Sequence, residues 1–369
     1  MLPLNWQKVR LGDIGKPCCC KRVMKHQTTR YGEIPFYKIG TFGNTADAFI
    51  SKKLFLEYKT KYSFPKKGDI LISASGTIGR AVIYDGKPAY FQDSNIVWID
   101  NDETLVKNDF LFYAYSNVKW NTEYTTILRL YNDNFRNTLI PLPPLNEQIA
   151  IANILSTLDR YLCALDALIL KKDGVKKSLS FELLSQRKRL KGFNQAWQRV
   201  RLGDIANYLT SNLSVEQITQ QGEIKVYDVN NFIGYTDTTF ISDKPYISIV
   251  KDGSVGRVRI LPPKTNILST MGALIANHRT TTEFLFYLLS NFDFKNFTSG
   301  SIIPHIYFKD YKEKTIFLPS LNEQSAIANI LSALDNEIAS LKNKKRQFEN
   351  IKKALNHDLM SAKIRVLEK

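Results

Sequence analysis

The sequence predicts an α+β protein in which two mixed α/β domains are separated by two long antiparallel helices. These helices are expected to form an intramolecular coiled coil, and the chain to have an internal pseudo-two-fold repeat. Two sequence repeats and one periodicity predict this fold. Residues 6–14, WQKVRLGDI, return as residues 197–205, WQRVRLGDI. Residues 143–159, which begin PPLNEQIAIANIL, return as residues 319–335, which begin PSLNEQSAIANIL. A helical periodicity of apolar residues follows each copy of the second block, so one scaffold is used twice around two different inserts.

The two inserts between the repeated blocks are expected to be distant relatives of one α/β fold. In the first insert, residues 69–73 and 95–99 are apolar runs between turn residues and predict strands, while residues 110–115 predict a short helix. Residues 247–250 and 284–289 occupy comparable places in the second insert, which is the shorter of the two. We therefore expect similar elements in both domains.

A glycine-rich motif occurs in both inserts, as GTIGR at residues 76–80 and as GSVGR at residues 253–257. One interpretation is that the backbone here comes close to a phosphate, with Arg80 or Arg257 assisting. The interpretation that we favour is a hairpin turn that ends in an exposed arginine. Because both copies have the motif, it indicates a role in the fold more than in sequence reading.

Each long helix is predicted to begin at the P-x-L-N-E-Q block and to run for about 40 residues, roughly 60 Å. Asn146 is expected to cap the first turn, Glu147 to place negative charge at the positive end of the helix dipole, and Gly192 to end the first helix. The apolar residues follow heptad spacing. They are Ile151, Leu155, Leu158, Leu162, Leu165 and Ile169 in the first helix, and Ile327, Leu331, Leu334, Ile338, Leu341, Phe348, Leu355 and Leu359 in the second, where Lys345 and Lys352 fill two intervening positions.

These elements divide the chain into a first domain at residues 1–143, a first long helix at 144–191, a second domain at 192–319 and a second long helix at 320–369. Two matching stripes in one chain are most simply buried against each other. The first helix must deliver the chain to the second domain, so an antiparallel pair with one domain at each end is favoured. A coiled coil between two chains is the weaker alternative, because each stripe already has a partner nearby.

The charge of the chain favours a polyanionic partner. Its 369 residues include 51 Lys and Arg against 35 Asp and Glu, a formal net charge of +16. Each phosphate that such a protein neutralises releases counterions and adds affinity, so nucleic acid is the first expectation and a membrane surface the second. We see neither a signal peptide nor an apolar run of about 18 residues, which favours a cytoplasmic protein.

The sequence lacks the usual marks of catalysis and of cofactor binding. Cys18, Cys19 and Cys20 are adjacent, a spacing that suits neither disulfides nor zinc, and the four histidines have no ligand spacing, so no metal is expected. Residues 12–16 do not have the spacing of a phosphate-binding P-loop, and no Gly-x-Gly-x-x-Gly follows a strand. The Asn-Pro-Pro-Tyr tetrapeptide of amino-methyltransferases is also missing. We expect no catalytic residue and no cofactor in this chain.

The duplicated first block, the repeated P-x-L-N-E-Q helix starts and the twin long helices together resemble the specificity subunits of Type I restriction-modification systems. The likeness covers nearly the whole chain, although the second insert is short. It implies that each insert is a target-recognition domain that reads one half of a bipartite double-stranded DNA site, and that the helices set the distance between the halves.

The resemblance also implies that two methyltransferase subunits, which carry S-adenosylmethionine, dock on the helices. Restriction would need two further subunits that use ATP and Mg²⁺, and a complex that only methylates fits the sequence equally well. The segments expected to contact a partner are the helix starts: Asn146, Glu147, Gln148, Asn322, Glu323 and Gln324.

The residues expected to contact DNA are basic, amide, hydroxyl and aromatic side chains in turn-rich stretches, because phosphate and base edges are bound by these groups. The late stretch of each insert, just before its long helix, is the favoured reader. For each single position, a solvated loop residue is an equally good interpretation. The residues are Lys21, Arg22, Lys25, Arg30, Arg80, Arg129, Tyr131, Asn132, Asn134 and Arg136 in the first insert, and Arg257, Ser299, Ser301, His305, Tyr307 and Lys309 in the second.

Three other functions compete with DNA recognition. An RNA-binding scaffold shares the basic charge and the aromatic-rich inserts. A structural coiled-coil connector would have the same charge as a solvated surface, and would bind no nucleic acid. A self-contained nuclease is disfavoured, because carboxylates clustered near a lysine are scarce.

Overall fold

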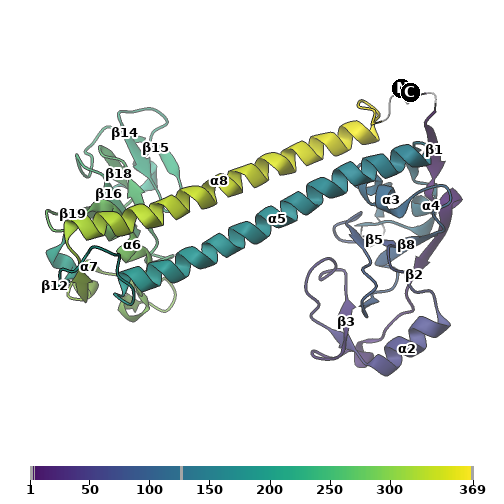
Figure 1. Cartoon of the computed structure of the whole chain (residues 1–369), viewed down its shortest axis with the longest axis horizontal. Coiled ribbons are helices and arrows are strands. Elements are labelled where there is room, and N and C mark those ends of the chain that lie inside the picture. The colour runs from purple at the N-terminus through teal and green to yellow at the C-terminus, as the bar shows by residue number, and fades with distance from the viewer. Residues whose placement is uncertain (1–2, 4, 125–127, 367–369) are drawn as a thin grey trace. The chain divides into compact units, whose positions relative to one another are not determined.

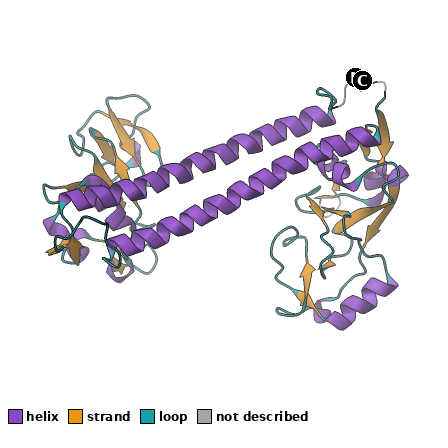
Figure 2. Cartoon of the chain, in the orientation of Figure 1, coloured by secondary structure: helices purple, strands orange, loops and turns teal. Residues whose placement is uncertain are grey.

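The computed structural model of the chain describes residue 3 and residues 5–124 and 128–366. It divides into two compact units: unit 1 consists of Met1–Leu165 and Lys344–Lys369, and unit 2 of Asp166–Asn343. We call the part of unit 1 that precedes the first long helix the first domain, and the part of unit 2 between the long helices the second domain. Strands and short helices are mixed in both domains (Figure 2).

The first domain has the strands and helices expected of a mixed α/β fold. In chain order they are β1 (Gln7–Arg10), α1 (Leu11–Ile14), β2 (Gly15–Cys19), β3 (Ile34–Tyr37), β4 (Phe49–Ile50), α2 (Lys52–Lys61), β5 (Ile70–Ser73), β6 (Ala81–Ile83), β7 (Tyr90–Phe91), β8 (Ile96–Asn101), α3 (Asn108–Tyr115), β9 (Glu123–Tyr124), β10 (Leu128–Arg129), α4 (Asn132–Asn137) and β11 (Leu139–Leu142).

The second domain has nearly the same elements in the same order. They are β12 (Gln198–Arg201), β13 (Ala206–Thr210), β14 (Ile224–Tyr227), β15 (Phe232–Thr236), β16 (Tyr246–Val250), β17 (Val258–Leu261), β18 (Thr265–Ile267), β19 (Met271–Ala276), α6 (Thr282–Ser290), β20 (Thr298–Ser299), β21 (His305–Ile306), α7 (Phe308–Tyr311) and β22 (Thr315–Leu318).

The sheets of the two domains match one to one. The four-stranded sheet β2-β8-β5-β6 corresponds to β13-β19-β16-β17, and the three-stranded sheet β4-β3-β7 to β15-β14-β18. Each first repeated block supplies a strand, β1 or β12, that pairs antiparallel with the last strand before a long helix, β11 or β22. The helix α2 contributes to the greater length of the first insert, because residues 237–245 of the second domain form no helix. The strands and short helices predicted from both inserts are confirmed.

The long helices are α5 (Leu145–Leu184) and α8 (Leu321–Met360), each of 40 residues. In unit 2, Lys172 pairs with Glu337 at 2.8 Å, and Lys176, further along α5, pairs with Asp335, which lies earlier on α8. Within this unit the two helices are therefore antiparallel and lie side by side (Figure 1). In unit 1 the ring of Tyr161 lies 4.7 Å from that of Phe348. The heptad stripes are buried or half-buried along both helices, which confirms the intramolecular pairing.

The helix ends differ from the prediction in two respects. The first helix begins at Leu145, so Asn146 lies inside the first turn and does not cap it. It ends at Leu184 and not at Gly192, because Gln186 adopts the left-handed conformation with φ 62° and turns the chain. Ala362, the equivalent residue after α8, does the same with φ 55°. Neither is a glycine, so the sequence carried no signal of these ends.

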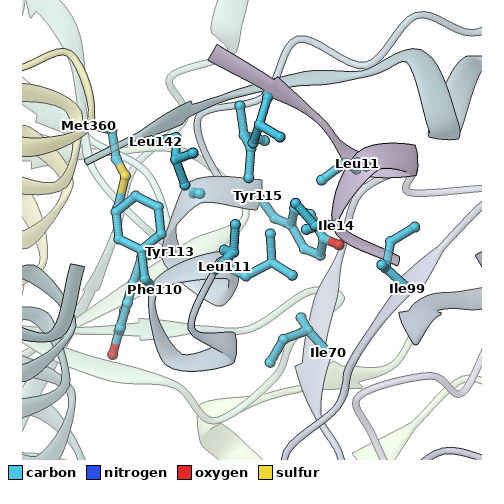
Figure 3. Packing of buried hydrophobic residues seen from close by; sticks show 14 of the residues in the cluster. Leu11, Ile14, Ile70, Ile99, Phe110, Leu111, Tyr113, Tyr115, Leu142 and Met360 are labelled. Carbon is cyan, nitrogen blue, oxygen red and sulfur yellow. The ribbon is translucent and has the colours of Figure 1, made fainter. Parts of the chain in front are cut away.

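The core of unit 1 joins the first domain to both long helices. Side chains of α1, β5, β8 and α3 pack together, and Met360 of α8 approaches them beside Leu142 and Phe110 (Figure 3). The core of unit 2 is built in the same way, with Leu331 of α8 and Leu183 of α5 packed into the second domain. Over the described residues, every helix is too short or too polar to cross a bilayer.

Candidate nucleic-acid interface

The late stretches of both inserts, predicted as loops, are instead a two-stranded hairpin followed by a short helix. In the first domain β9 pairs with β10 and α4 follows; in the second, β20 pairs with β21 and α7 follows. Isolated bridges join Ser75 to Arg129 and Asp252 to His305, so each hairpin is attached to the glycine-rich turn of its domain. The hairpins are therefore held in place by the four-stranded sheets.

A polar loop brings together the two basic stretches predicted in the first domain. Arg22, from the early stretch, donates from Nε to Asp93 Oδ2 at 2.8 Å. Arg129, from the late stretch, donates from Nη2 to the carbonyl of Ser94 at 2.5 Å. Ser94 has a φ of 51°, a left-handed conformation that turns the backbone here. Sequence reasoning missed this loop; the polar run QDSN between two apolar segments was its only signal.

The other predicted residues of the first domain are spread around these contacts. Lys21 lies with Nζ 5.1 Å from the ring centre of Tyr62, and Asn134 donates to Glu123 Oε1 at 2.7 Å. Arg129 lies 6.0 Å from the ring of Tyr131. Lys25, Arg30, Asn132 and Arg136 are exposed, and two of them, Asn132 and Arg136, line a cavity of about 500 Å³ with Lys16.

The predicted residues of the second domain gather on one hairpin and the residues after it. His305 Nδ1 lies 2.6 Å from Asp252 Oδ1. Lys309 places its Nζ 5.4 Å from the ring of Tyr307, which is half exposed. Ser299 and Ser301 are exposed on the hairpin. The structure thus brings these five residues into one polar, aromatic and cationic region.

The glycine-rich motifs are hairpin turns, as favoured from the sequence: one joins β5 to β6 and the other β16 to β17. Gly79 and Gly256 have φ of 84° and 80°, and a Cβ at either would lie 2.1 Å or 2.6 Å from an aromatic side chain. Arg80 donates from Nη1 to the carbonyl of Phe42 at 2.9 Å, and both Arg80 and Arg257 are exposed.

The expectation that the helix starts contact a partner is wrong for four of the six residues. Glu147, Gln148, Glu323 and Gln324 are at most 2% exposed. The side-chain amide of Gln148 donates to the carbonyl of Pro143 at 2.9 Å and accepts from the backbone N–H of Lys107 at 2.9 Å. These four side chains therefore attach each long helix to its own domain. Asn146 and Asn322 are exposed.

The buried glutamates are each held by a tryptophan and an arginine. Trp6 Nε1 donates to Glu147 at 3.0 Å, and Arg365, after the end of α8, donates to both carboxylate oxygens. In unit 2 Trp197 and Arg189 hold Glu323 in the same way. We call each set of Trp, Glu and Arg a clamp.

A second repeated contact joins each domain to both helices. Tyr113 of α3 donates to Asp159 of α5 at 2.7 Å, and Lys352 of α8 pairs with the same carboxylate. In unit 2 the corresponding set is Tyr287, Asp335 and Lys176. Burial raises the pKa of Tyr113 and Tyr287, and the hydrogen bond to the carboxylate raises it further.

The outer surfaces of the helices expose apolar side chains at matching positions. In unit 1 they are Leu145 and Ile351, which are 39% and 51% exposed, and in unit 2 Leu321 and Val175, which are 47% and 45% exposed. Each unit thus shows one residue at a helix start and one on the later part of the other helix. We call these two separate residues of each unit, one on each helix, its helix patch.

Large side chains at the hairpins were not predicted from the sequence. Tyr124 is 76% exposed in the hairpin of the first domain, and Ile302 is 92% exposed in that of the second. No cluster of three or more His, Cys, Asp or Glu side chains that could hold a metal occurs among the described residues. The cysteines are free thiols.

Comparisons with known proteins agree with this architecture. The family model described as "Type I restriction modification DNA specificity domain" matches residues 3–172 and 194–350. A relative from Haemophilus influenzae is 63% identical over 148 residues, which are 40% of this chain and 38% of that relative. The Type I restriction enzyme MjaVIII specificity subunit of Methanocaldococcus jannaschii is 25% identical over 99% of this chain and 94% of its own.

Solved structures share the fold. The crystal structure of a Type I restriction-modification S subunit from M. genitalium has a TM-score of 0.64 at 21% identity, and covers 97% of this chain and 98% of its own. A chain from a structure of a Type I R-M complex has a TM-score of 0.57 at 15% identity, and covers 99% of this chain and all of its own.

Proposed function

The chain belongs to the family of Type I restriction-modification DNA specificity subunits, and from this membership we propose that its two domains read the two halves of one interrupted, asymmetric double-stranded DNA site. The observation that carries the proposal is the presence of two complete domains with the same sheets, each inside one of the two ranges that the family model matches. We also propose that the chain itself has no catalytic step and binds no cofactor.

The reading elements that we propose are the hairpin and the short helix before each long helix. Both belong to the inserts, and they carry polar, cationic and aromatic side chains of the kind that contact phosphate and base edges. Arg129 and His305 occupy equivalent places, since each forms the bridge to its glycine-rich turn. Two side chains of such different chemistry at one position favour two different half-sites, and hence an asymmetric target.

The helix patches support the docking of two methyltransferase subunits. Each unit exposes a leucine at a helix start and a β-branched residue on the other helix, so the same two exposed apolar positions occur twice. An arrangement that occurs twice fits two copies of one partner. We propose that these partners carry S-adenosylmethionine, and that two restriction subunits with ATP and Mg²⁺ join where the system also cleaves.

The test is to purify the chain with the products of neighbouring genes, incubate the complex with DNA and S-adenosylmethionine, and map methylated adenines by long-read sequencing. We expect methylation at one interrupted, asymmetric motif. In further preparations, Arg129→Ala should reduce the sequence specificity of methylation in only one half of the motif, and His305→Ala only in the other half. Methylation without sequence preference by an assembled complex contradicts the proposal.

RNA binding is the competing function, and the same preparation decides it. Competition between double-stranded DNA and RNA of equal length at moderate salt should favour DNA. A preference for RNA would instead support the scaffold interpretation.

A further inference from the structure

The hairpin of the second domain carries an isoleucine that the fold does not use. Ile302 lies between β20 and β21 and is 92% exposed, the largest exposed fraction of any large apolar side chain among the described residues. Its neighbour Ile303 is 55% exposed. An apolar side chain so fully in water contributes little to folding, so its place at a hairpin tip points to a role in binding.

The backbone around Ile302 is held by several contacts. The N–H of Gly253 donates to the carbonyl of Pro304 at 2.9 Å, and the N–H of Ile306 donates to that of Lys251 at 2.9 Å. Gly300 has a φ of 88°, and a Cβ there would lie 2.3 Å from the carbonyl oxygen of Ile303. The turn is therefore tight and attached to the strand β16 and its turn, so binding needs little further ordering of the tip.

The surroundings of the tip fit nucleic acid better than an apolar protein pocket. Ser299 and Ser301 precede it on the chain, and both are exposed. Tyr307 and Lys309, which follow the hairpin, combine an aromatic ring with a cation 5.4 Å from its centre. Apolar wedges of Ile, Leu, Phe or Met set among polar and cationic groups are the means by which proteins partly unstack a base step.

We propose that Ile302 is a wedge that packs against the bases of the half-site read by the second domain and partly unstacks one base step. The inference rests on the proposed function, since it names how one of the two reading elements engages DNA. The hairpin of the first domain also exposes large side chains, Tyr124 at 76% and Leu128 at 48%. The wedge that we propose in the second domain is the aliphatic side chain of Ile302.

The experiment uses the assembled complex that methylates its motif, with 2-aminopurine placed at successive positions of each half-site. Binding of the unchanged complex should raise 2-aminopurine fluorescence at one step of one half-site. Ile302→Ala should abolish that rise and weaken binding to the motif about tenfold, with little change on DNA that lacks the motif. Ile302→Leu, which keeps the apolar bulk, should restore most of both signals.

The matched control is Val215→Ala, which truncates another exposed apolar side chain of the same unit, 65% exposed and outside the hairpin. It should behave as the unchanged complex does. The wedge is overturned if Ile302→Ala leaves fluorescence and affinity unchanged, or if no step responds to the unchanged complex. If Ile302→Ala weakens the assembly of the subunits in the absence of DNA, the side chain contacts a partner protein, and this result too contradicts the wedge proposal. A complex that methylates no motif contradicts the proposed function itself, which is a separate result.

Discussion

Arg365 forms a two-point ion pair with Glu147: its Nε lies 2.6 Å from one carboxylate oxygen and its Nη2 2.9 Å from the other. Glu147 lies in the first turn of α5 and Arg365 follows α8, so this pair ties the segment after α8 to the start of α5. Arg189 and Glu323 make the equivalent pair in unit 2, at 2.7 Å. Since both glutamates are buried, each clamp depends on its charge-assisted hydrogen bonds.

Removing the charge of one clamp should loosen only its own unit. Glu147→Gln should lower the free energy of unfolding by about 2 kcal/mol, because hydrogen bonds to a charged group are lost or weakened. Hydrogen exchange read by mass spectrometry should show faster exchange in unit 1 for this variant, and in unit 2 for Glu323→Gln. Equal changes in both units after either substitution would contradict independent clamps.

Loss of the hydroxyl should affect stability differently at the two tyrosines of α3, Tyr113 and Tyr115. Tyr113→Phe removes the hydrogen bond to Asp159 and should destabilise unit 1 by about 1 kcal/mol. The Tyr115 hydroxyl is buried and has no hydrogen-bond partner among the described residues, so Tyr115→Phe should be neutral or stabilising. Denaturant unfolding of both variants measures the difference. Comparable destabilisation by the two substitutions would show that the hydroxyl of Tyr115 is bonded in solution.

Stability should decline in alkaline solution. Burial raises the pKa of Tyr84 and Tyr246 to about 12, from an ordinary value of 10.0. Above pH 10 the unfolded chain therefore loses tyrosine protons that the folded chain keeps. This contribution to stability is fully present below pH 10 and is lost as the pH rises towards 12. Denaturant midpoints across this interval measure the decline, and Tyr246→Phe should make it shallower.

Each helix patch should hold one partner subunit. Val175→Asp places a charge in the patch of unit 2 and Ile351→Asp one in that of unit 1, both at exposed positions where the fold loses little. Native mass spectrometry of the complex should show two methyltransferase subunits on the unchanged chain, one on each single variant and none on the double variant. If the single variants keep both partners, docking lies elsewhere on the helices.

Much of the fold could be predicted from the sequence because its signals are local. The heptad stripe, the apolar strand at β5 and the glycine turn before Arg80 each follow from neighbouring residues. The helix ends could not be predicted, since Gln186 and Ala362 take a conformation usually left to glycine.

The site was predicted less well because its contacts are distant in the sequence. Asp93 and Ser94 connect Arg22 to Arg129 only once the sheets have formed. Glu147 and Gln148 were predicted to contact a partner, but they are buried. An acidic or amide residue at a helix start has the same sequence pattern whether it faces a partner or its own domain.

The placement of the clamps has a consequence for heredity. The repeated blocks contain all the tryptophans and glutamates of the clamps: Trp6, Glu147, Trp197 and Glu323. Each insert is therefore held at both ends by hydrogen bonds between residues outside the insert. Genetic exchange within these near-identical blocks would move a whole insert and leave its fastening intact. A lineage could therefore acquire a new DNA target in one recombination event, without a destabilised intermediate.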